Sequence, residues 1–286
     1  MKVKYLGKIT GKQDGAIWNG YLFRFDAKGN CNVFDIKDCM RSTDTRYMAI
    51  SNFTLDKADV IKPHSNSVTF GKEFYCQEDE FPLLYTNIYN NYAASDDKMK
   101  GVTCVYHIKK NGTEFSTELV QLIEIDFTDN SIWRSENIED SRPFGNFAID
   151  RENAVYYAFT MRDEDKVTRY FAFDLPKLGD GLYDEKYSVS RVLLGEENIK
   201  VQFDCEYHRY LQGACCHNGF IYSLEGFTDS AVNPPAIRVI DTEKKEQKAM
   251  YLFSDFNITV EPEMIDFEND ICYYSDNYGN LYQLEF

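Results

Sequence analysis

The 286-residue sequence lacks the positive charge that would balance its acids, and this deficit excludes several classes of ligand. Lys and Arg number 31 against 47 Asp and Glu, which gives a net charge of −16. Nucleic-acid binders need a basic surface, and anionic membranes attract basic segments. We therefore expect neither nucleic acid nor a membrane among the partners, and we interpret the acidity as a contribution to solubility.

Long apolar runs are also missing. No stretch approaches the roughly 18 consecutive apolar residues that a membrane-spanning helix needs. The first residues, MKVKYLGKIT, lack the apolar centre of a signal peptide. These two absences predict a cytoplasmic protein.

The sequence contains 8 cysteines, but none of them forms a C-x-x-C pair. A zinc site therefore has no support from spacing. In a cytoplasmic protein we expect all of them to be reduced, buried thiols. They lie at positions 31, 39, 76, 104, 205, 215, 216 and 272.

Trp is scarce, with 2 residues, whereas Tyr and Phe number 21 each, and both favour strands. These aromatic residues recur in one pattern: a strand of small residues, a turn, then an aromatic strand. The copies read KQDGAIWNGYLFRFDA, HSNSVTFGKEFYCQEDEFPLLYTN, PFGNFAIDRENAVYYAFT, LQGACCHNGFIYSLEG and EPEMIDFENDICYYSD. Regular repetition of such a unit indicates a solenoid, propeller or array.

Further strands follow the copies. We expect third strands in NVFDIKD, LIEIDFTD, YFAFDLP and IRVIDTEKK, and fourth strands in RYMAISNF, NGTEFSTELVQLIEI, YSVSRVLL and EQKAMYLF. The hairpin of the second copy is expected at Asn111-Gly112, a strong turn signal. Four strands per repeat and no amphipathic helix indicate propeller blades.

The whole chain, 1–286, is thus predicted to be one all-β domain, a five-bladed β-propeller. Its last copy is one strand short, and the N-terminal KVKYLGKIT belongs to no other copy, so we expect that strand to complete the last blade and close the ring. A β-sandwich, two small β domains, or six blades with the region 55–144 split are the alternatives. Cys215 and Cys216 should point to opposite faces of an inner strand and act as packing residues rather than as a redox or metal pair.

One polar position repeats where the five inner strands begin. It is occupied by Asp14, Asn66, Asn146, Gln212 and Glu263. We expect these residues to form a ring at the mouth of the central channel, because an unpaired buried polar group costs about 1–3 kcal/mol and would not recur in an apolar core. The ring could line a water-filled channel or bind a ligand. Its oxygen-rich side chains make Ca²⁺ or Mg²⁺ the possible cofactors.

Polar and aromatic residues are expected in the loops on the same face. The candidates for ligand binding, besides the ring amides, are His64, Asp204, Tyr207, His208 and Glu225. Asp204 to His208 fall in QFDCEYHRYLQG, which we expect to be a loop. Aromatic faces, carboxylates and amides that converge on one mouth suit a polar small molecule, above all a carbohydrate.

Carboxylates at the same mouth leave an enzymatic alternative open. The candidate catalytic residues are Asp14, Glu206, Glu261 and Glu263. Glu261 and Glu263 flank Pro262 and share a face in an extended segment. Crowding two carboxylates raises the pKa of one of them and makes a proton donor, as glycoside hydrolysis requires.

The repeat pattern as a whole resembles five-bladed propellers of two kinds: tachylectin-type lectins and arabinanase-type glycoside hydrolases. The arabinanase resemblance implies a base on the first inner strand, which Asp14 in KQDGAIW matches. It also implies a second Asp on the next inner strand, where this chain has Asn66. The sequence thus supports three hypotheses: a carbohydrate-binding propeller, a glycoside hydrolase, and a scaffold that docks a protein partner through NIYNNYAASDDKMKG.

Overall fold

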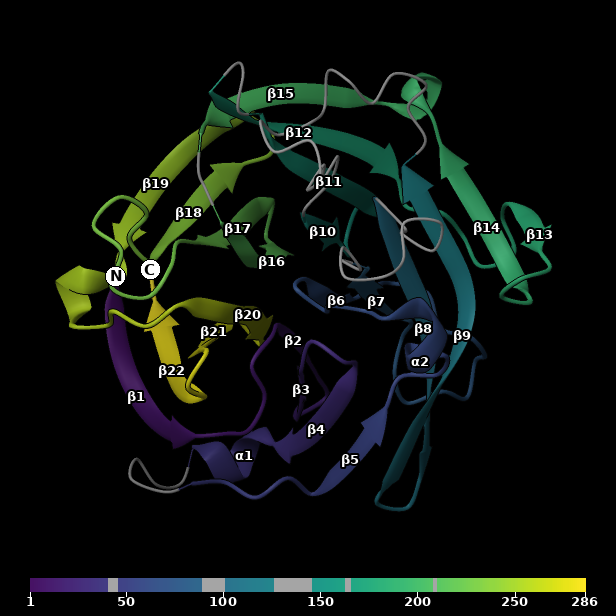
Figure 1. Cartoon of the computed structure of the whole chain (residues 1–286), viewed down its shortest axis with the longest axis horizontal. Coiled ribbons are helices and arrows are strands. Elements are labelled where there is room, and N and C mark those ends of the chain that lie inside the picture. Colours follow the sequence, from purple (N-terminus) through teal and green to yellow (C-terminus); the bar gives the residue numbers. More distant parts are fainter. Residues whose placement is uncertain (41–45, 89–100, 126–145, 163–165, 208–209) are drawn as a thin grey trace.

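A computed structural model of the chain describes residues 1–40, 46–88, 101–125, 146–162, 166–207 and 210–286. Its described strands form five sheets arranged in a ring around a central axis (Figure 1). The protein is a five-bladed β-propeller, as the sequence predicted. Among the described residues, no helix is both long and apolar enough to cross a bilayer.

Two blades follow the predicted pattern of four antiparallel strands in chain order from the axis outward. The first blade contains β2 (Gly15–Trp18), β3 (Tyr21–Phe25), β4 (Asn30–Asp35) and β5 (Ser51–Thr54). The fourth contains β16 (Leu211–His217), β17 (Phe220–Glu225), β18 (Ala236–Asp241) and β19 (Glu246–Leu252). Asn-Gly pairs turn the inner hairpin of both blades, at 19–20 and 218–219, with positive φ at both residues. This backbone conformation matches the twist of adjoining strands, so these turns explain the sharp inner hairpins.

The last blade is closed by the N-terminal strand, which confirms the predicted closure. It contains β20 (Pro262–Glu268), β21 (Ile271–Asp276), β22 (Asn280–Glu285) and, outermost, β1 (Lys2–Lys8). β1 pairs antiparallel with β22, from Lys2 opposite Glu285 to Lys8 opposite Asn280. The two chain ends consequently lie side by side (Figure 1).

The second and third blades correct the predicted strand assignment. The third blade contains β10 (Asn146–Asp150), β11 (Val155–Arg162), β12 (Val167–Asp174) and β15 (Val201–Glu206). The second contains β6 (Val68–Phe70), β7 (Leu84–Asn87), β8 (Val102–Asn111), β9 (Glu114–Ile125), β14 (Val189–Leu194) and β13 (Leu182–Asp184). The β8–β9 hairpin turns after Asn111, as expected, but LIEI is part of the fourth strand β9 and not a third strand.

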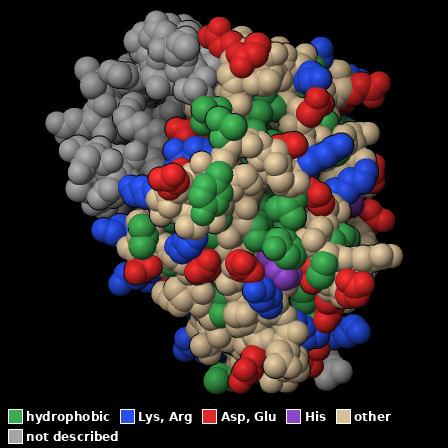
Figure 2. Space-filling view, turned by 90° about the vertical axis from the view of Figure 1, so that its right-hand side faces the viewer, with side chains coloured by type: hydrophobic (Ala, Val, Ile, Leu, Met, Phe, Trp, Pro, Cys, Tyr) green, Lys and Arg blue, Asp and Glu red, His purple; other side chains and the backbone are tan. Residues whose placement is uncertain are grey.

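YSVSRVLL was wrongly assigned to the third blade. Its strand β14 pairs in parallel with β9 of the second blade, where Arg191 forms ion pairs with Glu124 and Asp184. The outer strand of the third blade is β15, within the segment that we expected to be a loop. The chain therefore crosses from blade three to blade two and back. Figure 2 shows the side that carries β13 and β14, where acidic and basic side chains are interspersed with hydrophobic ones.

The apolar core of the described residues consists of five clusters, one between each pair of neighbouring blades. Successive residues of an inner strand alternate between the two adjoining clusters. Cys215 lies in the cluster shared by blades four and five, whereas Cys216 packs against the cluster of blades three and four. Their expected role as packing residues on opposite faces is confirmed.

Short helices complete the described structure. They are α1 (Ile36–Cys39), α2 (Ala58–Ile61) and the 3₁₀ turns η3 (Glu196–Asn198) and η4 (Phe253–Phe256). All the cysteines lie in described segments and are free thiols. Cys216 is partly buried and Cys76 is exposed, so the expectation that every thiol is buried is wrong for Cys76, which lies in the connection between β6 and β7.

Candidate functional site

The amides of the predicted ring meet at the start of the inner strands and bond to one another. The Nδ2 of Asn66 donates to Oδ1 of Asn146 at 2.9 Å and to the carbonyl of Leu211 at 3.0 Å. The Nδ2 of Asn146 donates to the carbonyl of Gln212, whose Nε2 donates to Oε1 of Glu261 at 2.6 Å. The amide donors of the ring thus already have protein acceptors.

The acidic members of the ring, Asp14 and Glu263, are buried beside a buried guanidinium. Asp14 and Arg24 have no exposed surface, and Glu263 is 2% exposed. Asp14 accepts the backbone N–H of Val68 at 2.8 Å, and Arg24 donates to the carbonyl of Asp276 at 3.2 Å. One oxygen of each carboxyl, together with Nε and Nη1 of Arg24, has no hydrogen-bond partner among the described residues. The charge of Arg24 is thus the main compensation for Glu263, whereas the backbone N–H groups of Val68 and Gly15 oppose the burial of Asp14 more than Arg24 does.

Burial dominates the protonation of these acids. It raises the pKa of Asp14 and of Glu263 well above their ordinary values, against the opposing effect of Arg24. The pKa of the partly buried Glu261 is raised too, by burial, although its hydrogen bonds with Asn277 and Gln212 oppose the rise. The Glu261 charge in turn helps to raise the pKa of Glu263, as the predicted carboxylate pair requires.

The raised pKa of Glu263 predicts a pH-dependent stability difference. Because the folded carboxyl holds its proton to higher pH than the unfolded one, wild-type stability from this group falls as pH rises above the ordinary value of 4.5. Glu263→Gln should therefore gain stability relative to wild type with rising pH, by about 1.4 kcal/mol per pH unit in this window. Urea unfolding from pH 4 to 8 measures it. The exposed Glu243→Gln is the control, and parallel pH curves for Glu263→Gln and wild type would contradict the assignment.

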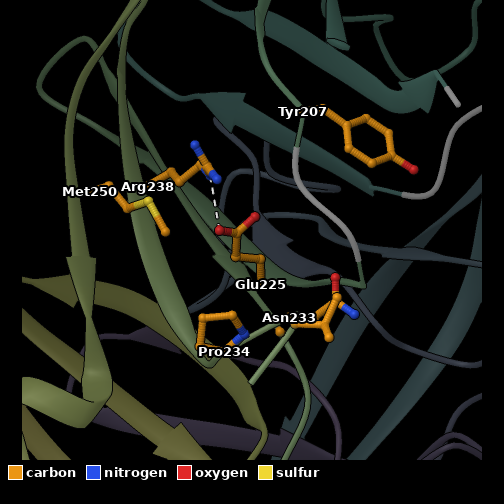
Figure 3. A pocket seen from close by; sticks show the side chains of 8 residues that line it. Tyr207, Glu225, Asn233, Pro234, Arg238 and Met250 are labelled. Carbon is orange, nitrogen blue, oxygen red and sulfur yellow. Dashed lines mark hydrogen bonds and ion pairs between the residues drawn. The ribbon is translucent and has the colours of Figure 1, made fainter. Parts of the chain in front are cut away.

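A pocket of about 290 Å³ lies between Tyr207, which follows the outer strand of blade three, and residues of blade four. Its lining consists of Tyr207, Glu225, Gly226, Val232, Asn233, Pro234, Arg238 and Met250. In Figure 3, Met250 and Arg238 stand on one side, Tyr207 stands on the other, and Glu225 lies between them. The pocket therefore presents polar groups and apolar surface together.

Arg238 organises the polar side of this pocket. Its Nε donates to Oε1 of Glu225 at 2.9 Å, and its Nη1 donates to Oε2 of Glu206 at 3.0 Å and to Oε1 of Gln247 at 2.6 Å. Glu225 ends β17, Arg238 lies in β18 and Glu206 ends β15, so the guanidinium joins the outer strand of blade three to blade four. The Arg238 and Glu225 side chains are 8% and 7% exposed, which makes this a buried pair at the pocket wall.

The loop after β17 encloses the pocket because of its glycine. Gly226 has φ +102°, and a Cβ there would lie 2.3 Å from the carbonyl oxygen of Pro234. The close approach lets the chain fold back, with the N–H of Phe227 donating to the carbonyl of Asn233 at 3.0 Å. Only glycine fits this position without strain.

Several sequence candidates lie outside the pocket. Asp204 lies on β15 and forms a two-armed ion pair with Arg169, at 2.6 and 2.7 Å. His64 is partly buried in the segment between α2 and β6. His208 lies outside the described residues. Of the expected loop cluster, Tyr207 thus lines the pocket and Glu206 bonds to Arg238 of the lining, whereas Asp204 pairs with Arg169.

Sequence reasoning found Glu206, Tyr207 and Glu225 but missed Arg238 and Met250. A signal for Arg238 was present, since it interrupts the apolar run of AIRVID in a strand that is buried throughout. A buried arginine requires acceptors, and those acceptors mark the site. As for the possible channel cation, no group of three or more His, Cys, Asp or Glu side chains in the described segments could hold a metal ion.

Comparison with known proteins reveals likeness of fold only. No protein-family model and no curated protein matches the sequence. Similar solved structures include hydrazine synthase of Kuenenia stuttgartiensis, with 10% identity and a TM-score of 0.44 over 92% of this chain and 61% of that one. BamB from Moraxella catarrhalis has 6% identity and a TM-score of 0.36, covering 100% and 98%. The propeller domain of the Trilobed protease from Pyrococcus furiosus has 10% identity and a TM-score of 0.32, covering 66% and 52%. The chain spans less than two thirds of the hydrazine synthase chain.

Proposed function

We propose that this propeller binds a small carbohydrate in the pocket between blades three and four. The observation that carries the proposal is the buried Arg238–Glu225 pair in the wall of a pocket of about 290 Å³. Such a volume is near the lower end of the roughly 300–1,000 Å³ typical of small-molecule sites, which suits one sugar ring. Carboxylate oxygens accept hydrogen bonds from hydroxyl groups, and Tyr207 and Met250 supply apolar surface for the C–H face of a sugar.

The axis is a poorer place for a sugar than the pocket. The ring amides donate to protein acceptors, and the inner strands approach closely there. A Cβ on Gly213 would lie 2.3 Å from the carbonyl oxygen of Glu263 and 2.7 Å from Oδ1 of Asp14. We therefore propose the pocket between blades three and four as the carbohydrate site, in place of the channel mouth that the sequence led us to expect.

The burial and the partners of the carboxylates also favour sugar binding over glycoside hydrolysis. A catalytic acid or nucleophile must touch the substrate, whereas Asp14 and Glu263 are buried. Glu206 and Glu225 are engaged with Arg238. Of the two resembled kinds of propeller, the lectin type is thus the better functional parallel. The alternative of a protein scaffold remains a prediction, because most of NIYNNYAASDDKMKG lies outside the described residues.

Glu225→Gln is expected to weaken carbohydrate binding about tenfold or more, because a hydrogen bond to a charged group contributes roughly 1.5–3 kcal/mol. The substitution keeps the shape of the side chain and an acceptor for Arg238. The measurement is calorimetric titration with a panel of neutral, amino and acidic monosaccharides, after a glycan-array screen. Glu246→Gln, an exposed carboxylate on the adjoining β19, is the matched control.

The outcomes separate the two candidate locations. Loss of affinity in Glu225→Gln with retained affinity in Asn66→Ala supports the pocket. Loss in Asn66→Ala alone would return the site to the channel mouth. Absence of binding to every sugar in the wild-type protein would refute carbohydrate binding altogether.

A further inference from the structure

Two aromatic rings stand exposed beside the pocket. Tyr210 and Phe227 are 47% and 49% exposed, and their ring centroids are 5.6 Å apart with an angle of 48° between the ring planes. The N–H of Gly226, a residue of the pocket lining, donates to the carbonyl of Tyr210 at 3.1 Å. Since Tyr210 bonds to Gly226 and Phe227 follows it in the chain, the pair adjoins the pocket lining, and we call these two exposed rings the aromatic corner.

The backbone holds this pair in place at a conformational cost. Tyr210 has φ +54°, in the left-handed region that an aromatic residue seldom adopts. Phe227 is fixed by the bond from its N–H to the carbonyl of Asn233, and Ser230 donates in turn to the carbonyl of Phe227 at 3.2 Å. Strain of this kind concentrates at ligand sites, and here it presents an aromatic ring to solvent.

Polar groups lie between the aromatic pair and the axis of the propeller. Thr228, next to Phe227, accepts the N–H of Glu261 through its Oγ1 at 2.9 Å. Glu261 is only partly buried and bonds to Gln212 and Asn277. A ligand that leaves the pocket over the aromatic pair would consequently meet a carboxylate and hydroxyl at the channel mouth, so that apolar and polar surfaces alternate along its path.

We infer that Tyr210 and Phe227 form a second sugar subsite, so that the ligand of this protein is an oligosaccharide of at least two units. The inference rests on the proposed function. One unit occupies the pocket at Arg238 and Glu225, and the next places its C–H face on the aromatic corner. Such pairing of apolar ring faces with flanking polar groups suits an amphipathic sugar chain, whose hydroxyl edges reach Thr228 and Glu261.

The test compares matched sugars of increasing length. Titrations use glucose with maltose and cellobiose, galactose with lactose, and N-acetylglucosamine with chitobiose and chitotriose. Wild type should bind the fitting disaccharide about tenfold more tightly than its monosaccharide. Phe227→Ala should abolish that gain and leave the affinity for the monosaccharide within about twofold of the wild-type value. Tyr210→Asn should do the same, and asparagine is chosen there because it tolerates the left-handed backbone of this position.

Controls keep the two proposals distinguishable. Tyr183→Ala removes an even more exposed aromatic ring, on β13, and should leave the disaccharide gain intact. If monosaccharides and disaccharides bind wild type equally, or if Phe227→Ala weakens both equally, the second subsite is wrong while the pocket stands. If no sugar binds at all, the proposed function itself fails. Self-association in sedimentation that Phe227→Ala abolishes would assign the corner to a second copy of the chain and overturn the inference.

Discussion

Replacing Arg24 with methionine is expected to lower the free energy of unfolding by about 1–3 kcal/mol. The guanidinium is buried with Asp14 and Glu263, and its charge opposes the burial that raises both of their pKa values. Methionine keeps much of the apolar stem but removes the charge and the hydrogen bond to the carbonyl of Asp276, which leaves buried acceptors without this donor. A buried polar group that loses its hydrogen-bond partner typically costs this much. Urea unfolding at pH 7, followed by fluorescence, measures the change.

Two further variants sharpen this test. Arg46→Met, at an exposed position, should change the free energy of unfolding by less than about 0.5 kcal/mol. The double variant Arg24→Met with Glu263→Gln should recover part of the loss, because one buried acid is then replaced by a neutral amide of the same shape. Equal stability of Arg24→Met and wild type, or no recovery in the double variant, would show that Arg24 does not compensate these carboxyls.

The architecture could be predicted because it rests on local, repeated signals. The inner hairpins of the first and fourth blades carry Asn-Gly turns at 19–20 and 218–219, and the strands that follow these turns are aromatic, so the sequence alone identifies the inner hairpins of these two blades. The polar ring positions follow from the same repeat. The N-terminal strand, which belongs to no other repeat, can then be assigned to the incomplete last blade, since that blade would otherwise leave an unpaired edge.

Pairing between distant strands could not be predicted in the same way. The alternation in Val189–Leu194 shows that this segment is a strand but does not say which sheet edge it joins. Its place beside β9 depends on tertiary contacts, among them Arg191 with Glu124. The same limit applies to the pocket, because Arg238 finds Glu225 in its own blade and Glu206 in the neighbouring one.

Deleting residues 1–8 is expected to abolish the cooperative unfolding transition. The deletion removes β1, and with it the whole antiparallel ladder on β22 and the buried side chain of Leu6, which is 1% exposed. Leu6 belongs to the cluster between the last and first blades, so the loss affects the contact that closes the ring. A domain of this kind is stabilised by only about 5–15 kcal/mol in total, and the loss of a strand with its core contacts approaches that amount.

Thermal unfolding followed by circular dichroism, with sedimentation to detect association through the exposed β22 edge, measures the outcome. Lys4→Ala leaves the ladder and Leu6 in place and changes only an exposed side chain, so its transition should match that of wild type. Leu6→Ala should lie between them, with a loss of about 2–5 kcal/mol from the cavity that it leaves. A shortened chain that still unfolds cooperatively near the wild-type midpoint would show that the other four blades hold the ring without β1, and that the closing strand contributes protection of the edge rather than stability.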